Sequence, residues 1–306
     1  MWSQIALEAL LPVVPGLVGG SADLTGSNNT KGKGQPVVSA DDFSASYIHF
    51  GVREHAMAAA MNGLALYGGL IPYGGTFLVF TDYCRPSIRL SALMGVGAIY
   101  VMTHDSIGLG EDGPTHQPVE HVAALRAMPN LNVFRPACGV ETAECWELAV
   151  KARTTPSVLA LTRQGVVNAR SDGDSENRSA RGGYVVAGDA ASRAVTLIAT
   201  GSEVGLALEA REALGAKGVE AAVVSMPCLE LFDEQGPDYA REVLGDGPRI
   251  VVEAGVRNGW DRYLREGDAF IGMSSFGISA PAGQAYAHFG ITAQAVEQAA
   301  LNLTGK

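Results

Sequence analysis

The sequence predicts two α/β domains in tandem, each built on a parallel β-sheet. Three observations support this: strand-length apolar runs alternate with helix-like segments, a polar stretch over residues 167–183 interrupts the alternation, and the alternation then resumes. Such a rhythm is typical of parallel sheets, because each parallel strand needs a long crossover back to the same edge. We therefore expect a boundary near Arg181, with domains over residues 1–180 and 181–306.

Local hydrophobic patterns define the expected elements of the first domain. Apolar runs of strand length fit the buried strands of a parallel sheet, and longer segments fit the connecting helices. The expected strands are Leu17–Gly20, Ser46–Phe50, Leu70–Tyr73, Gly97–Thr103, Asn132–Phe134 and Ser157–Leu161. The expected helices are Val52–Leu66, Thr76–Leu93, Pro118–Ala127 and Val140–Arg153.

The same alternation continues in the second domain. The expected strands are Ala194–Ala199, Ala221–Ser225, Arg249–Glu253 and Ala269–Gly272, and the expected helices include Glu203–Leu214. Residues 245–247 read Gly-Asp-Gly, which is similar to part of a metal-diphosphate motif. Turns of this composition before a strand are common, so we interpret these residues as a turn.

Composition and charge restrict the class of protein. The 306 residues are 47% hydrophobic and 18% charged, which is the balance of a globular protein with a buried core. The net charge is −10, and no stretch is rich in Lys and Arg. Nucleic acids and anionic membranes both require clustered basic residues, so we expect neither as a partner.

Cysteine usage and the lack of a recognisable targeting segment favour a cytoplasmic location. The four cysteines show no C-x-x-C pair and no metal-finger spacing, so buried reduced thiols are expected. Residues 1–20 are apolar but carry Glu8 and lack a basic start, unlike a signal peptide. Residues 56–72 are too short and too often interrupted to span a membrane.

The loop Thr103–Pro118 concentrates two His, three acids and three Gly directly after an apolar run. Within it, residues 108–113 match the G-x-G-x-x-G fingerprint of dinucleotide-binding proteins. We reject that match because two acids stand where a pyrophosphate needs backbone donors and positive charge. The loop is better interpreted as a rigid segment that presents His104, Asp112 and His116 to a polar substrate.

Further polar residues follow other predicted strands. Open α/β sheets bind ligands beyond the carboxyl ends of their strands, so these positions are candidate site residues. They are Ser21, Asp23, Ser27, Asn28, Arg53, Glu54, Arg163 and Gln164. Together with the two imidazoles, Asp112 and Arg163 predict a site for a phosphorylated, hydroxylated substrate.

Two features have competing interpretations at this point. Glu54 occupies the first turn of a predicted helix, where an acid either complements the helix dipole or serves as a functional acid, and the residues alone favour the dipole. Phe77, Phe80 and Tyr83 recur at three-residue intervals on the next predicted helix, which ordinary core packing explains.

Several motifs together resemble transketolase, a thiamine diphosphate enzyme. They are Gly19–Leu24, His49–Glu54, Thr103–Pro118, Leu161–Gln164 and Ala199–Val204. The resemblance covers essentially the full chain. It implies that the first domain is the pyrimidine-binding domain of a thiamine diphosphate enzyme, and that the second is the C-terminal domain of the family.

The resemblance implies a set of cofactor-binding residues. Glu54 is expected to hydrogen-bond the aminopyrimidine ring of thiamine diphosphate and to promote the imino tautomer that deprotonates the thiazolium carbon. Phe77, Phe80 and Tyr83 are expected to line the pocket on which the pyrimidine ring packs. Asp23 is placed with these cofactor-binding residues.

The resemblance also implies substrate-binding roles. Asp112 and His116 are expected to contact the substrate hydroxyls near the reacting carbons, so His116 joins Glu54 as a catalytic candidate. Ser27, His104 and Arg163 are expected to hold the phosphate of the substrate. The implied reaction transfers a two-carbon ketol unit from a ketose phosphate to an aldose phosphate.

One half of the family's active site lies outside this sequence. The diphosphate-binding domain of the family, which carries a Gly-Asp-Gly…Asn motif for Mg²⁺ and the cofactor diphosphate, has no counterpart here, and a phosphate-binding Arg of the family falls just before Met1. We therefore expect the chain to be inactive alone and to need a separate diphosphate-binding domain or chain, in a dimer or heterotetramer. The alternatives are another thiamine diphosphate enzyme, of 2-oxoacid dehydrogenase β-subunit or deoxyxylulose-phosphate synthase type, and a non-catalytic fragment.

Overall fold

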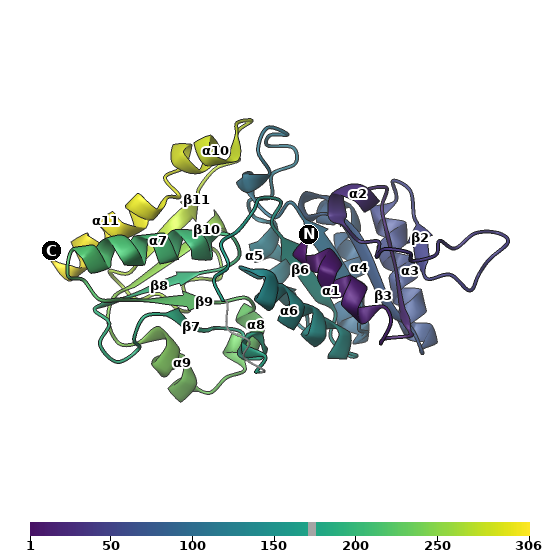
Figure 1. Ribbon diagram of the computed structural model, residues 1–306, viewed down its shortest axis with the longest axis horizontal. Coiled ribbons are helices and arrows are strands. Elements are labelled where there is room, and N and C mark those ends of the chain that lie inside the picture. The colour runs from purple at the N-terminus through teal and green to yellow at the C-terminus, as the bar shows by residue number, and fades with distance from the viewer. Residues whose placement is uncertain (171–175) are drawn as a thin grey trace.

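The computed structural model describes residues 1–170 and 176–306. Within these ranges the strands form a six-stranded and a five-stranded sheet, which lie side by side along the length of the molecule (Figure 1). Helices cover both faces of each sheet, as expected for an α/β protein. The predicted pair of α/β domains is confirmed in architecture, while the boundary near Arg181 stays a prediction.

The first sheet is parallel throughout, in the order β2-β1-β3-β4-β6-β5. Its strands are β1 (Leu17–Ser21), β2 (Tyr47–His49), β3 (Ile71–Phe77), β4 (Ile99–Thr103), β5 (Asn132–Phe134) and β6 (Ser157–Leu161). The helices of this half are α1 (Trp2–Leu10), α2 (Thr25–Asn28), α3 (Glu54–Tyr67), α4 (Thr81–Met94), α5 (His121–Arg126) and α6 (Gly139–Lys151), with short 3₁₀ turns η1 (Leu78–Phe80) and η2 (Ile107–Leu109).

The central strand β4 shows how the sequence builds this core. Its side chains alternate between the two faces of the sheet, as the period of two requires. Tyr100 and Met102 pack with α3, α4 and α5, whereas Ile99 and Val101 pack with α1 and α6. Because both faces are covered, β4 is fully buried and its carboxyl end opens only at the sheet edge.

The second sheet has the order β11-β10-β8-β9-β7. Its strands are β7 (Tyr184–Ala187), β8 (Val195–Ala199), β9 (Ala221–Ser225), β10 (Arg249–Val256) and β11 (Ala269–Met273). Its helices are α7 (Glu203–Ala216), α8 (Leu229–Asp233), α9 (Pro237–Leu244), α10 (Ala282–His288) and α11 (Ala293–Thr304). The edge strand β7 pairs antiparallel with β9, so this sheet is mixed rather than purely parallel.

The predicted helix over Thr76–Leu93 is wrong in its first part. Thr76 and Phe77 end β3, where Phe77 aligns with Thr103 of β4, and α4 begins only at Thr81. Pairing with a neighbouring strand therefore overrides the local helical pattern. As a result, the three aromatic residues at 77, 80 and 83 do not share one helix.

Two other expectations concern connecting segments. Gly245 ends α9 with φ 67°, so residues 245–247 form the expected turn before β10. The predicted linker over residues 167–183 includes residues 171–175, which lie outside the described residues. Arg178–Arg181 form the 3₁₀ turn η3.

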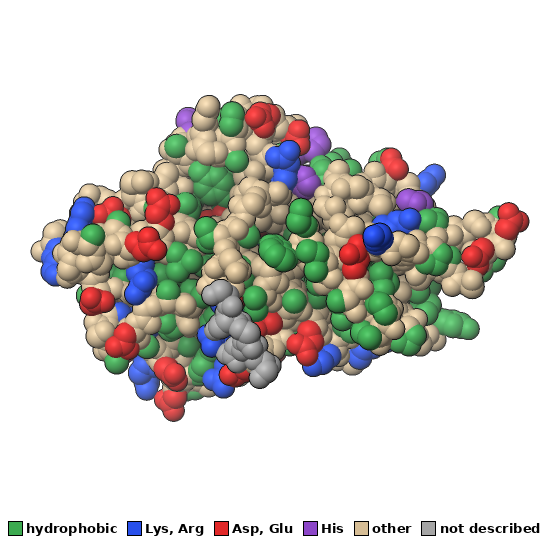
Figure 2. Space-filling model, in the orientation of Figure 1, with side chains coloured by type: hydrophobic (Ala, Val, Ile, Leu, Met, Phe, Trp, Pro, Cys, Tyr) green, Lys and Arg blue, Asp and Glu red, His purple; other side chains and the backbone are tan. Residues whose placement is uncertain are grey.

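The surface agrees with the charge analysis. On the face shown in Figure 2, acidic and basic side chains are interspersed, without an extended basic patch. The four cysteines all lie in the described ranges, where they are buried and free. Across those ranges no helix combines the length and the apolar character that crossing a membrane requires.

Candidate active site

The loops after β1, β4 and β6 meet at one cavity of about 530 Å³. Parallel strands end at the same edge of a sheet, so polar residues far apart in sequence come together there. Ser27, His104 and Arg163 all line this cavity, as does Asn28. The structure thus brings together the three residues that the sequence places on the phosphate of a substrate.

His104 is buried at the base of this cavity and has an unusual backbone. Its φ is 63°, in the left-handed region that residues with a Cβ seldom adopt, and such strain clusters at functional sites. Burial, followed by the nearby Arg163, lowers the pKa of His104 to about 4, while Asp112 opposes this shift and His116 adds to it. The imidazole is therefore neutral at physiological pH, and the four side chains lie close enough to interact electrostatically.

A chain of hydrogen bonds fixes the orientation of His104. The Asn28 amide donates to Thr103 Oγ1 at 2.6 Å, and its carbonyl oxygen accepts from Ser21 Oγ at 3.1 Å. Because Thr103 Oγ1 already accepts from Asn28, its own proton is free to go to His104 Nδ1, 2.8 Å away. The neutral ring then carries its proton on Nε2 as a hydrogen-bond donor.

Aromatic rings surround the two histidines. Phe77 stacks on His104 with ring centroids 3.9 Å apart and an interplanar angle of 29°. Phe80 meets His116 edge-on at 5.5 Å between ring centroids, and its ring lies 5.7 Å from that of Tyr83 at an interplanar angle of 30°. Tyr83 is 62% exposed and Phe80 is only partly buried, so the interpretation of these aromatics as a plain core stripe is wrong.

Glu54 is the first residue of α3 and is 8% exposed. Among the described residues its carboxylate has no hydrogen-bond partner, although it lies close enough to Cys84 of α4 to help burial raise the pKa of that thiol to about 12. A carboxylate that only complements a helix dipole gains nothing from burial, because desolvation disfavours its charged form. The burial of Glu54 therefore favours a functional role.

Of the remaining predicted site residues, three are exposed and one is partly buried. Asp112 and Arg163 lie on the solvent side of the loops after β4 and β6, and His116 is partly buried, with its Nδ1 3.0 Å from Thr115 Oγ1. Asp23 is exposed and has φ 62°. No contact in the described part of the chain joins Asp23 to the aromatic group or to Glu54.

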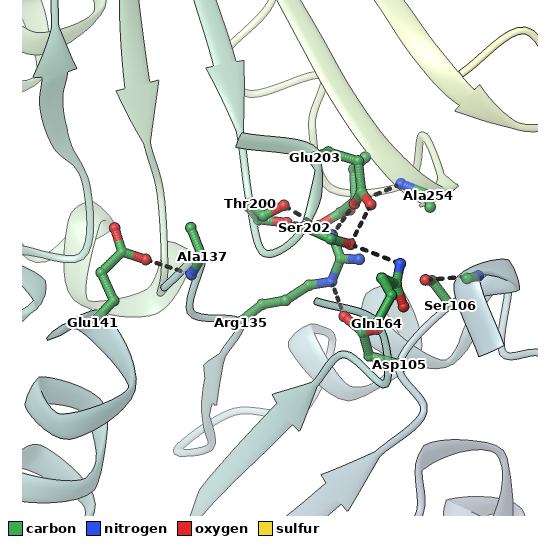
Figure 3. A network of polar contacts seen from close by, with 12 residues as sticks. Asp105, Ser106, Arg135, Ala137, Glu141, Gln164, Thr200, Ser202, Glu203 and Ala254 are labelled. Atoms are coloured by element: carbon green, nitrogen blue, oxygen red, sulfur yellow. Dashed lines mark hydrogen bonds and ion pairs between the residues drawn. The ribbon is translucent and has the colours of Figure 1, made fainter. Parts of the chain in front are cut away.

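A buried polar network lies directly behind the cavity and was missed from the sequence (Figure 3). Arg135, which follows β5, binds Asp105 of the first domain through Nε at 2.8 Å and Glu203 of the second domain through Nη1. Arg126 forms a bidentate pair with Glu253, at 2.9 Å for both bonds. The sequence signal that could have revealed this network is Arg135 itself, a charged residue directly after the fifth strand.

The charges of this network are nearly balanced. Burial raises the pKa of Asp105 despite the adjacent Arg135. Burial also disfavours the Glu253 carboxylate, but Arg126 and Arg135 outweigh it and lower the pKa of Glu253 to about 2. The charged groups of the network are therefore paired with one another in the interior, whereas Arg163 at the cavity is exposed to solvent.

In residues 1–170 and 176–306, no group of three or more His, Cys, Asp or Glu side chains is arranged to hold a metal ion. The polar side chains that line the cavity are instead hydroxyls, amides, the His104 imidazole and the Arg163 guanidinium.

Comparison with known proteins matches both halves of the chain. Residues 1–167 match the family model "Transketolase, pyrimidine binding domain", and residues 182–292 match "Transketolase-like TK C-terminal domain". A transketolase from Cereibacter sphaeroides is 60% identical over 97% of this chain, and one from Sinorhizobium medicae is 59% identical over 98%. The chain spans only 45% and 44% of these relatives.

Solved structures of transketolases match the chain as well. A transketolase from Leishmania mexicana superposes with a TM-score of 0.94 at 46% identity, covering 99% of this chain and 45% of that one. A split-gene transketolase, described as an inactive β4 tetramer, superposes with a TM-score of 0.81 at 25% identity. That match covers 99% of this chain and 97% of the other.

Proposed function

This chain belongs to the transketolase family, and from that premise we propose that it forms the pyrimidine-binding and sugar-phosphate side of a thiamine diphosphate-dependent transketolase. The proposed reaction transfers a two-carbon ketol unit from a ketose phosphate to an aldose phosphate. The observation that carries the proposal is the convergence of Ser27, His104 and Arg163 on one cavity.

These three side chains suit a phosphate. Arg163 offers an exposed guanidinium, Ser27 an exposed hydroxyl, and His104 the Nε2–H that its contact with Thr103 leaves free. Charge-assisted hydrogen bonds to a phosphate are the strongest of their kind, and Arg can bind two oxygens at once. Binding energy gained at the phosphate then orients the reacting end of the sugar.

We place the reacting end of the sugar at Asp112 and His116. Both side chains interact electrostatically with His104, so they lie near the phosphate-binding residues. His116 also contacts Phe80. An imidazole can donate a hydrogen bond to a sugar hydroxyl or move a proton from it. Asp112 accepts hydrogen bonds from neighbouring hydroxyls and so selects their arrangement.

The residues around Glu54 fit the heterocycle of thiamine diphosphate. Glu54 is buried, and its carboxyl group has no hydrogen-bond partner among the described residues. It can therefore form a hydrogen bond with a ring nitrogen, and the low dielectric of the site strengthens that bond. Phe77, Phe80 and Tyr83 offer aromatic faces to a flat ring. When bound, thiamine diphosphate supplies the carbon nucleophile of the transfer.

We assign the cofactor diphosphate and Mg²⁺ to a separate diphosphate-binding domain or chain, with assembly as a dimer or heterotetramer. Large apolar side chains exposed on α3 and α4 support such an assembly, because apolar groups gathered on a surface often mark an interface. They are Leu66, Tyr67, Tyr83, Leu90 and Leu93. The match to a β4 tetramer of a split-gene transketolase supports it as well. The free cysteines fit a cytoplasmic location.

The direct test is a transketolase assay with a ketose phosphate donor and an aldose phosphate acceptor. We expect turnover when the chain is assembled with a diphosphate-binding half, thiamine diphosphate and Mg²⁺, and none from the chain alone. Full activity of the chain alone would contradict the proposal. Turnover of 2-oxo acids in place of sugar phosphates would favour a different thiamine diphosphate enzyme.

A matched pair of variants tests Glu54. Glu54→Gln in the assembled enzyme should lower kcat by about 10²- to 10⁴-fold, the usual range for loss of a general acid or base. Asp238→Asn is the control, because Asp238 also occupies the first turn of a helix, α9, but is 95% exposed. Equal kcat values for the two variants would mean that Glu54 only complements the helix dipole.

A further inference from the structure

The two loops that carry the phosphate-binding side chains both reach into the C-terminal domain. His104 is followed by Asp105, and Arg163 is followed by Gln164. In each pair the first residue lines the cavity, as Gln164 also does, and the side chain of the second contacts the C-terminal domain or a residue bound to it. Consecutive residues therefore link the candidate site to a part of the protein with no assigned role.

Gln164 is wedged between the two loops. Its side chain packs against Gly108 so closely that a Cβ added there would lie 2.0 Å from Gln164 Nε2. The same amide nitrogen lies 3.4 Å from Ser202 Oγ and 3.4 Å from the Tyr286 hydroxyl. Gln164 thus connects the loop after β6, the loop after β4 and the C-terminal domain.

Tyr286 of α10 is the point where these contacts meet. Its hydroxyl donates to Glu203 Oε1 at 2.6 Å, and burial followed by Glu203 raises the pKa of Tyr286 well above its ordinary value. With its single proton committed to Glu203, the hydroxyl accepts from Ser106 Oγ at 3.3 Å and from Gln164. One phenol oxygen therefore receives a donor from each loop.

Glu203 connects Tyr286 to Arg135 through its two carboxylate oxygens. Its other oxygen accepts from Arg135 Nη1 and, at 3.0 Å, from the backbone N–H of Ala254. Arg135 in turn binds Asp105 through Nε (Figure 3). Both loops are consequently tied to the same buried carboxylate, in a setting where low dielectric strengthens each bond.

We propose that Tyr286 is a positioning residue, through which the C-terminal domain holds His104 and Arg163 at the separation that a substrate phosphate requires. This inference rests on the proposed function for the identity of the phosphate. Tyr286 acts through Ser106 and Gln164 and need not touch the substrate. Small displacements of binding groups cost much affinity, so loss of one tether is measurable.

The test uses Tyr286→Phe in the assembled enzyme, because this change removes the hydroxyl and keeps the ring. We expect KM for a phosphorylated ketose to rise about tenfold, while kcat and the KM for the unphosphorylated ketose change by less than about twofold. Tyr239→Phe is the matched control, since its hydroxyl donates to Gly183 O at 2.8 Å within the C-terminal half and should change neither constant.

A second measurement does not depend on turnover. The chain itself is titrated with inorganic phosphate while the imidazole signals of His104 are followed by NMR, and Tyr286→Phe should weaken binding about tenfold. If the assembled wild-type enzyme shows no transketolase activity but this difference persists, the proposed function fails and the positioning role stands.

Three results would overturn the inference. They are unchanged constants for both ketoses and for phosphate, an equal loss for the phosphorylated and unphosphorylated ketose, or the same effect in Tyr239→Phe. If Tyr286→Phe does not fold, Gln164→Ala replaces it, because it removes the contacts to Ser202 and Tyr286 from the other side. A selective rise of KM for the phosphorylated ketose then supports the role, and no rise contradicts it.

Discussion

The loop after β4 contributes both to the cavity lined by Ser27, His104 and Arg163 and to the buried network of Asp105 and Arg135. The two regions differ in the exposure of their charged side chains. Arg163 is exposed to solvent, whereas the Arg135 side chain is 1% exposed and carboxylates bind it from both domains. A guanidinium buried between carboxylates of both domains is out of reach of a substrate, whereas one left open to solvent can bind it.

The comparison also explains why both regions are needed. Open charges on mobile side chains bind weakly, because each must be ordered when the ligand arrives. A buried network of charge-assisted hydrogen bonds beside them fixes the backbone from which they project. Substitutions should therefore change the free energy of unfolding most in the network and least at the cavity.

The largest effect is expected for Arg135→Leu. This substitution leaves Asp105, Glu203 and the nearby Glu253 buried without their shared cation, so unfolding should become easier by about 3–5 kcal/mol. Urea unfolding followed by circular dichroism measures the change. A loss below about 1 kcal/mol would show that the buried carboxylates do not depend on Arg135 for neutralisation. The network would then not differ from the cavity in this respect.

A smaller effect is expected for Thr103→Val at the border of the two regions. The change removes the acceptor of the Asn28 amide and the donor to His104 Nδ1, at a cost of about 1–3 kcal/mol for the unsatisfied group. Nitrogen NMR should also show loss of the pure Nε2–H tautomer. Thr155→Val is the control, because its hydroxyl bonds Asn130 at an exposed position and should cost less than about 0.5 kcal/mol.

The pH dependence of stability tests His104. Its folded pKa of about 4 lies below the ordinary value of 6.5, so its contribution is complete above pH 6.5 and is lost as pH falls through 4. Between pH 7 and 5.5, wild type should lose about 1 kcal/mol more than His104→Gln. If wild type and His104→Gln lose the same stability over this range, the folded protein accommodates the charged imidazolium. His104 would then resemble the solvent-exposed charges and not the buried network.

The smallest effect on stability is expected for Arg163→Leu. Exposed substitutions change the free energy of unfolding by less than about 0.5 kcal/mol, whereas loss of a charge-assisted hydrogen bond should weaken phosphate binding about 10- to 100-fold. Urea unfolding and KM for the phosphorylated ketose measure the two quantities. Large destabilisation with unchanged KM would reverse the comparison between Arg163 and Arg135.

Several parts of the site were predictable from residue order. Parallel strands bring the residues after β1, β4 and β6 to one edge, and Ser27, His104 and Arg163 do line one cavity. The positions of Phe77 and Phe80 were not predictable in this way. Their spacing fits a helix, but Phe77 aligns with Thr103 of β4, a partner that local patterns do not reveal.

The sequence by itself determined the α/β architecture and the family, because hydrophobic periodicity and motifs are encoded locally. The tertiary structure alone decided which charges stay open and which are buried. Arg135 and Glu203 are 68 residues apart, and Ser106 and Tyr286 are 180 apart. Such pairings arise only when two domains pack together, since burial and charge neutralisation are properties of the packed interface.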